Sequence, residues 1–212
     1  MAYDLEEQEQ IENLREFWKK YGNFILTLVI AVALATAGWG LWKRYQTSQA
    51  QEAATAYHQL LLAAEAKDMA KVRDSAGVLF DRHGRSVYGG MAALVAARAY
   101  LESGDGKAAK VPLRWAIDNA SNDEFRHAAR LRLATVLLDE KAFDEGLKVL
   151  EVQVAGPFAS EYADRRGDLL VAAGNLEQAR AAYQEALGKL PGNSPVRNLI
   201  QLKLDSLGAG AA

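Results

Sequence analysis

A run of nineteen uncharged residues near the start of the chain limits what the protein can fold into. From Phe24 to Trp42 the sequence reads FILTLVIAVALATAGWGLW, with basic residues close to both ends. As a helix this run spans roughly 29 Å, which matches a hydrocarbon core of about 30 Å. Thr27 and Thr36 are its only hydrogen-bonding side chains before the tryptophans, so it lacks the polar face of a soluble surface helix. We therefore expect residues 23–43 to form a membrane-spanning helix.

A cleaved signal peptide is the main alternative to a retained span. Ala35-Thr36-Ala37 imitates a small-residue cleavage site, and cutting after Ala37 would release a secreted protein. However, the segment ahead of the run is 23 residues long and rich in Asp and Glu, whereas a signal peptide usually begins with a short basic region. The apolar run also continues to Trp39 and Trp42, which suit a lipid headgroup boundary. The retained anchor is favoured, and the cleaved form stays open.

The basic residues that flank the span predict its orientation. Arg15, Lys19 and Lys20 precede the run, whereas only Lys43 and Arg44 follow it closely. Because cytoplasmic flanks carry the excess of Lys and Arg, this small majority favours a cytoplasmic N-terminus. The larger part of the chain would then lie outside the cytosol.

Small residues recur on one side of the expected span. Thr27, Ala31, Ala35 and Gly38 are spaced by four, four and three residues, so they fall on one helix face and could let another helix approach closely. Small residues are also simply common in membrane spans. The packing face is therefore one of two interpretations.

Residues 1–22 are expected to form a cytoplasmic amphipathic helix that runs into the span. The apolar residues at helical spacing are Ile11, Leu14, Phe17, Trp18 and Tyr21, and the acidic residues on the other side are Glu9, Glu12 and Glu16. This helix could lie at the membrane interface or dock on a partner, although its acids disfavour adhesion to anionic lipid. A solvated extension of the span is an equally valid interpretation.

The remaining residues, 44–212, predict an all-α repeat domain. They are rich in the strong helix formers Ala, Leu, Glu, Lys and Arg, and show no convincing strands. Turn residues interrupt the helical pattern at short intervals, which predicts pairs of helices of roughly 12 to 18 residues. These interruptions are Lys67-Asp68, His83-Gly84, Ser103 to Gly106, Ser121 to Asp123, Glu140-Lys141, Gly156-Pro157, Gly174-Asn175 and Pro191 to Asn193.

Internal similarity indicates which kind of helical domain this is. A segment that begins near Ser160 has Gly167, Ala179 and Tyr183 where tetratricopeptide repeats place small and aromatic residues. Similar copies place Ala134, Gly146 and Leu150 in register 33 residues earlier, and begin near Gly90 with Ala97, Tyr100, Ala109, Leu113 and Ala116. We expect about four hairpins, the first from about Ala53 to Asp81, and a capping helix from Pro195 to Leu207. An alanine-rich helical bundle could imitate this pattern. The predicted fold is a single transmembrane helix followed by a tetratricopeptide-like helical repeat solenoid.

Composition and motifs argue against catalysis and against nucleic-acid binding. Lys and Arg total 25 against 27 Asp and Glu, so no basic field is present, and cysteine is absent. His58, His83 and His127 stand far apart and are best explained as surface or core histidines. The chain shows no phosphate loop and no nucleophile elbow. Its Asp and Glu residues are best explained as helix caps and as residues of solvent-exposed helix faces. We expect a binding protein, not an enzyme, with no cofactor, metal or catalytic residue.

The first helices of the expected hairpins would supply a binding groove. By the tetratricopeptide register, the groove positions are Met91, Leu94, Arg98 and Leu101, then Ala128, Leu131, Thr135 and Leu138, then Glu161, Asp164, Asp168 and Val171. The first two sets are mostly apolar, which suits weak contact with extended polypeptide. Two alternatives stay open: the leucines could be ordinary core, or the chain itself could fill the groove.

The sequence resembles the YfgM-type proteins, the ancillary subunits of the bacterial Sec translocon. The resemblance covers essentially the full length and is most specific over residues 7–57, with Glu9 to Trp18, Tyr21-Gly22, a span that ends Ala37-Gly38-Trp39, and Ala53 to Tyr57. It implies a single-pass inner-membrane protein with a periplasmic repeat domain. It also implies association with the SecYEG translocon, with a membrane-anchored periplasmic chaperone of the PpiD type, and with newly exported polypeptides.

Two functional hypotheses follow. The first is a membrane-tethered adaptor whose repeat domain binds partner chaperone or exported chains beside the translocon. The second is a structural scaffold that organises an envelope complex through its span and its acidic helix.

Overall fold

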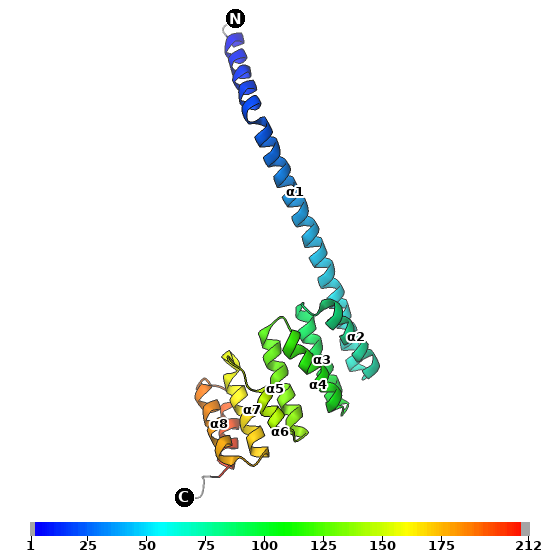
Figure 1. Cartoon of the computed structure of the whole chain (residues 1–212), viewed down its shortest axis with the longest axis vertical. Helices are drawn as coiled ribbons and strands as arrows, with labels where there is room; N and C mark the ends of the chain where they lie inside the picture. The colour runs from blue at the N-terminus through cyan, green and yellow to red at the C-terminus, as the bar shows by residue number, and fades with distance from the viewer. Residues whose placement is uncertain (1–2, 209–212) are drawn as a thin grey trace. The chain divides into compact units, whose positions relative to one another are not determined.

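The computed structural model describes residues 3–208 and is built from helices. Residues 1–2 and 209–212, which the predicted domains 1–22 and 44–212 include, lie outside the described residues. Within residues 3–208 every regular element is helical, which confirms the all-α fold (Figure 1). The chain divides into two compact units, residues 1–51 and residues 52–212.

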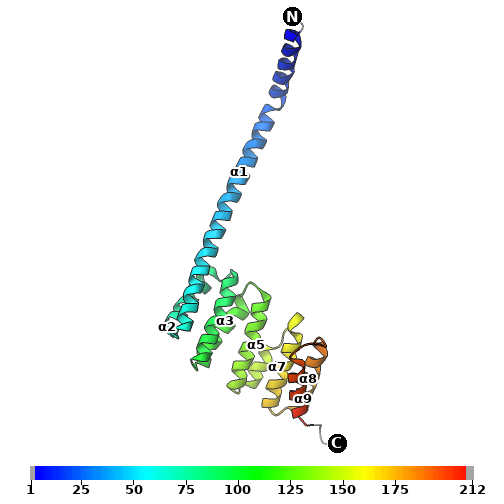
Figure 2. The ribbon, with the colours of Figure 1, turned by 180° about the vertical axis from the view of Figure 1, so that it is seen from behind.

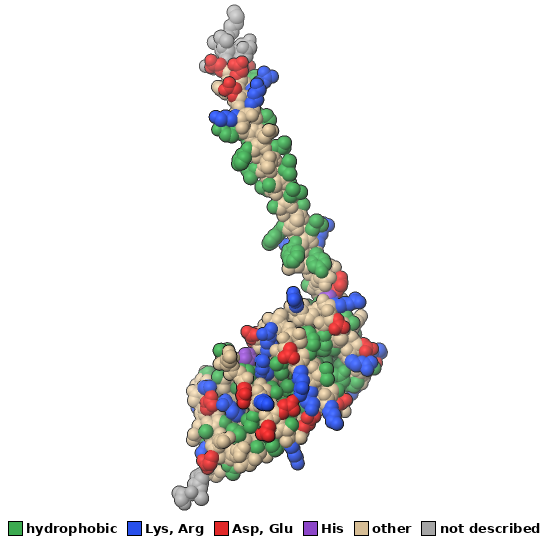
Figure 3. Space-filling model, viewed as in Figure 1, with side chains coloured by type: hydrophobic (Ala, Val, Ile, Leu, Met, Phe, Trp, Pro, Cys, Tyr) green, Lys and Arg blue, Asp and Glu red, His purple; other side chains and the backbone are tan. Residues whose placement is uncertain are grey.

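The first unit consists of one helix. Helix α1, Tyr3–Glu65, passes through the predicted amphipathic segment and the predicted span without a break. Its apolar window has a mean hydropathy of 2.2 and none of it is buried, so α1 has the length and composition to cross a membrane. Figure 3 shows the uncharged stretch of this unit between groups of charged side chains. The domain boundaries at 22 and 43 remain predictions.

Threonine hydroxyls inside the apolar run are satisfied by the helix itself. Thr27 Oγ1 donates to the carbonyl oxygen of Asn23 at 2.8 Å, and Thr36 Oγ1 donates to that of Ala33 at 3.0 Å. A donor without a partner would be costly in hydrocarbon, where water cannot replace it. The two polar side chains therefore do not oppose membrane insertion.

The second unit is a row of helical hairpins closed by a last helix (Figure 2). Residues 52–65 of α1 pack with α2, and α3 pairs with α4, α5 with α6, and α7 with α8. The bounds are α2 Met69–His83, α3 Val87–Glu102, α4 Gly106–Asn119, α5 Asp123–Asp139, α6 Phe143–Val149, α7 Ala159–Ala172, α8 Leu176–Lys189 and α9 Arg197–Ser206, with a short 3₁₀ helix η1 at Gly156–Phe158. The four hairpins and the capping helix α9 match the expected arrangement.

Each hairpin turns through a residue with a positive φ angle. The four residues are Lys67 at 54°, Gly104 at 82°, Lys141 at 60° and Gly174 at 81°. This left-handed conformation ends the first helix, and it favours glycine because a side chain strains it. Asp68 and Asp105 then accept hydrogen bonds from backbone N–H groups at the start of α2 and α4. The predicted interruptions therefore lie at real turns.

In each hairpin one buried residue of the first helix shares a core with a buried residue of, or directly after, the second helix. The four pairs are Leu60 and Ala76, Ala97 and Leu113, Ala134 and Leu150, and Gly167 and Tyr183. In each pair one residue is small and the other is large, and the two lie sixteen positions apart in the sequence. A Cβ atom on Gly167 would stand 2.4 Å from the ring of Tyr183, so the largest residue is matched by the smallest. The helices therefore approach closely without leaving a void.

The second helix of the third hairpin is half as long as expected. The prediction of 12 to 18 residues is wrong for α6, which has 7, whereas α4 and α8 each have 14. The reason is local sequence: β-branched Val152 and Val154 follow, and then Gly156-Pro157 stops the helical pattern. Leu150, which shares a core with Ala134, therefore comes directly after the last residue of α6.

We expect the Gly167→Ala substitution to destabilise the repeat unit by about 1–3 kcal/mol, because the new methyl group overlaps the Tyr183 ring. The matched control is Gly77→Ala, since Gly77 lies inside α2 and a Cβ atom added there would meet no other atom within 4 Å. That control should stabilise α2 by about 0.5–1 kcal/mol. Denaturant unfolding followed by circular dichroism measures both. Equal effects of the two substitutions would contradict the close crossing.

Candidate binding groove

The first helices of successive hairpins stand side by side. Helix α5 packs against both α3 and α7, and Figure 2 shows the three helices in this order. We call the predicted positions on these three helices the groove face. Its residues are Met91, Leu94, Arg98 and Leu101 on α3, Ala128, Leu131, Thr135 and Leu138 on α5, and Glu161, Asp164, Asp168 and Val171 on α7.

The part of the groove face on α3 and α5 is apolar and only partly covered. Leu94, Leu131 and Leu138 are partly buried and pack against the cores between the hairpins. Leu101 is 39% exposed, and Met91 is partly buried. The leucines thus contribute to the core and also keep accessible surface, and their binding role remains a prediction.

The polar side chains on this face make mostly local contacts. Arg98 Nε lies 2.6 Å from Glu102 Oε1 in an exposed ion pair within α3. Arg132 Nη1 donates to the carbonyl oxygen of Leu94 at 3.5 Å, which links α5 to α3. Thr135 Oγ1 donates to the carbonyl oxygen of Leu131 at 3.0 Å. Arg98 therefore keeps donors that face solvent, because a single carboxylate occupies only part of its guanidinium group.

The part of the groove face on α7 is closed by α9. Lys203 Nζ donates to both oxygens of Asp164, at 2.8 and 2.9 Å, and lies 2.8 Å from Asp168 Oδ1. Val171 packs near Leu204 and Leu207 in the same core. Helix α9 thus occupies Asp164 and Asp168, as the alternative that the chain fills its own groove expects, whereas Glu161 is exposed.

Asp168 joins the hairpin crossing to the cap. Tyr183 Oη donates to Asp168 Oδ1 at 2.8 Å, and Arg165 Nη1 donates to Oδ2 at 3.0 Å. Burial raises the pKa of Tyr183, and the hydrogen bond to Asp168 raises it further. Tyr183 therefore stays protonated and acts as a donor. The network links α7, α8 and α9 through the carboxylate of Asp168.

The three histidines lie where a structural role explains them. His58 is exposed and His83 is buried. His127 stacks on Phe158 with ring centroids 5.0 Å apart, and its Nδ1 lies 2.9 Å from Tyr162 Oη. Among residues 3–208 no three His, Asp or Glu side chains come together in a way that could hold a metal ion.

The short helix α6 leaves a cleft that the sequence reasoning missed. The cleft has a volume of 590 Å³ and lies between the end of α6, the segment from Glu151 to Ala155, and helices α7 and α8. Its floor includes Leu150, Tyr162 and Leu170. Polar and apolar residues alternate in Glu151-Val152-Gln153-Val154, a pattern that does not continue a helix. This pattern predicts the early end of α6.

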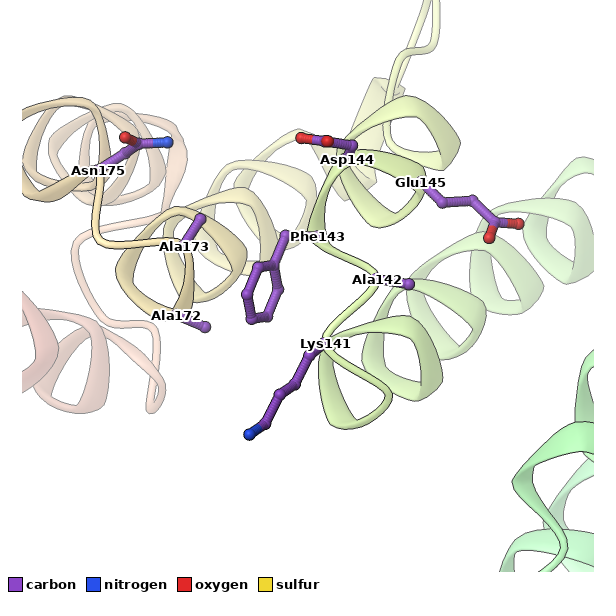
Figure 4. Close-up of a pocket in the computed structure, with 8 residues that line it drawn as sticks. All are labelled: Lys141, Ala142, Phe143, Asp144, Glu145, Ala172, Ala173 and Asn175. Carbon is purple, nitrogen blue, oxygen red and sulfur yellow. The ribbon is translucent and has the colours of Figure 1, made fainter.

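A smaller hollow of 400 Å³ lies at the turn ends of the third and fourth hairpins (Figure 4). Phe143 points toward Ala172 and Ala173, and the side chains of Lys141 and Asp144 diverge. Charged groups that diverge do not form an acid–base pair. This hollow is a packing feature.

Lys203 offers a test of how α9 is held. We expect Lys203→Met to destabilise the repeat unit by about 2 kcal/mol, because it leaves the partly buried Asp164 without its cation. The control Lys189→Met removes an exposed ion pair with Glu185 and should cost less than about 0.5 kcal/mol. Urea unfolding midpoints of the two variants give the comparison. Equal midpoints would show that the ion pairs of Lys203 do not hold α9.

Comparisons with known proteins agree with this architecture. A family described as a tetratricopeptide repeat-like domain matches residues 15–209. A protein of Neisseria gonorrhoeae is 31% identical over 98% of this chain and 100% of its own length. Proteins of Escherichia coli and Haemophilus influenzae are each 25% identical, over 95% and 98% of this chain and 96% and 100% of their own lengths. All three are named ancillary SecYEG translocon subunit. This chain therefore belongs to the family of ancillary SecYEG translocon subunits, the YfgM-type proteins, and carries their tetratricopeptide repeat-like domain.

Proposed function

We propose that this protein is a single-pass inner-membrane adaptor of the Sec translocon. In this proposal residues 1–22 lie in the cytoplasm and the repeat domain lies in the periplasm, where it binds newly exported polypeptides or a membrane-anchored chaperone of the PpiD type. The relatives named as translocon subunits support the association with SecYEG. The three basic residues before the span and the two behind it support the orientation.

The observation that carries the binding role is the partly exposed apolar surface on α3 and α5. Leu101 is exposed on α3, where Met91 and Leu94 are partly accessible, and Leu131 and Leu138 are partly accessible on α5. Such a surface gives low affinity and low sequence specificity, because apolar contacts are not directional. Arg98 adds donors that an extended chain could meet with its carbonyl oxygens.

A weak site is sufficient when it is tethered. A membrane anchor converts an encounter in free solution into one at high effective concentration beside the exit of the translocon. Weak contact also allows a chain to be released again. The apolar surface and the anchor therefore suit an adaptor better than a storage or catalytic role.

Site-specific photocrosslinking tests the proposed surface. A photoreactive residue at Met91 or Leu101 should form adducts with a translocating polypeptide or with the chaperone in intact membranes. The control position is Val111 on the second helix α4, which is 68% exposed and lies outside the groove face. Adducts that are equal at Val111 and at Leu101, or that contain lipid alone, would contradict the binding role.

Membrane retention tests the anchor. We expect the full-length chain to stay in the pellet after alkaline carbonate washing, because an uncharged helix of bilayer length remains embedded. Its intact mass should include residues 1–37. A mature chain that begins after Ala37 would instead support the secreted form and remove the tether from the proposal.

A further inference from the structure

The helix ahead of the span carries a seven-residue repeat. From Ile11 to Phe24 the sequence is IENLREFWKKYGNF, which is two heptads. Positions a and d are apolar in both heptads: Ile11, Leu14, Trp18 and Tyr21. Positions b, c and f are polar in both: Glu12, Asn13, Glu16, Lys19, Lys20 and Asn23. This separation is typical of a helix that packs along one seam against another helix.

The same seam continues into the span. Positions a and d of the next heptads are Ile25, Leu28, Val32, Ala35, Trp39 and Trp42. Ala31 and Gly38 fall at position g beside the seam, so part of the predicted small-residue face lies on the same side of α1. One continuous stripe therefore runs from before the membrane to its far boundary.

The stripe has no partner within the described part of the chain. Ile11 is 64% exposed, Leu14 is 65% exposed and Trp18 is 61% exposed. Within the helix the aromatic rings meet only local neighbours: Phe17 lies 5.1 Å from Tyr21, and Trp18 lies against Gly22. Apolar side chains at this density on one helix face mark an interaction surface.

Lipid does not explain the first part of the stripe. Helix α1 continues without a break from this segment into the span, so Leu14 stands about 14 Å ahead of residue 23 along the axis. The headgroup region is only about 5–8 Å thick on each side of the hydrocarbon core. Leu14 and Ile11 therefore project into water, where a partner helix can cover them. Glu9, Glu12 and Glu16 also oppose adhesion to an anionic surface.

We propose that the occupant of this seam is α1 of a second copy, packed in parallel. Two copies in one membrane share orientation and register, so Leu14 meets Leu14 and Tyr21 meets Tyr21. The flanking positions fit this pairing, because g faces e of the next heptad in the partner. Arg15 then faces Gln10, and Phe17 faces Gly22, so no like charges meet at these two flanking pairs and the largest flanking side chain meets the smallest. The acids at b and f point away from the seam.

The two heptads lie ahead of the span, where association of two helices is most favourable. Inside a bilayer the lipid tails are as apolar as the helix, so apolar residues there give little drive to pair. The start of the segment ahead of the span stands in water, and covering Ile11 and Leu14 there is favourable, whereas Trp18 and Tyr21 lie at headgroup depth. These two heptads would supply the association, and the span would follow in register. The pairing is independent of what the repeat domain binds.

Cysteine crosslinking tests the pairing directly, because the natural chain has no cysteine. Full-length Leu14→Cys and Tyr21→Cys proteins would be oxidised in native membranes and compared with Glu16→Cys and Lys20→Cys on the opposite side. All four sites are exposed on the helix, so none of these changes should disturb folding. A disulfide requires Cα atoms within roughly 7 Å, which positions a and d satisfy and positions c and f do not.

We expect at least about tenfold more disulfide-linked homodimer from the two seam positions than from the two controls, since only the seam meets the distance limit. Coexpression of two tagged forms would identify the adduct as two copies of this chain. Equal crosslinking at all four positions would indicate random collision and overturn the proposal. Adducts with a different protein at Leu14→Cys, or no adduct at any position, would overturn it as well.

Discussion

The close crossing of two helices at one buried pair is the contact on which each hairpin depends. A large residue fills the space above a small one, as in Gly167 with Tyr183, and the first pair reverses the order with Leu60 and Ala76. The summed volume is what the crossing requires, so either helix can supply the larger side chain. Once the crossing is set, the outer faces of each hairpin meet the next hairpin, and the apolar cores follow one another along the row.

The membrane-spanning part of α1 exposes its apolar side chains, and the repeat unit buries them. In the repeat unit, apolar residues are covered by other helices, whereas α1 leaves its apolar run exposed over the whole span. The run satisfies its own polar groups, since both Thr27 and Thr36 donate back to the helix. The chain thus combines a repeat unit that buries its apolar residues away from water with a helix suited to lipid. One continuous helix, α1, belongs to both parts.

Local patterns predict most of the fold, because turns and crossings are short-range features. Gly174 and Gly104 indicate their turns, and the spacing of Ala97, Ala134 and Gly167 gives the repeats. The repeat register alone does not predict the shortened α6, because it takes no account of the β-branched side chains at Val152 and Val154. The closure of the groove face by Lys203 could not be read from sequence, since it joins residues 39 positions apart through a tertiary contact. The apolar positions on α3 and α5 remain predicted binding residues.

The half-length α6 also affects how the array responds to mechanical load. In a stack where each hairpin is supported only by its neighbours, cohesion at any joint scales with the surface shared there. Helix α6 offers seven residues to the next hairpin where the neighbouring second helices offer fourteen, and the adjoining cleft removes further contact. The joint between the third and fourth hairpins therefore shares less surface than the joint before it, and we expect the array to bend there first when its C-terminal end is pulled.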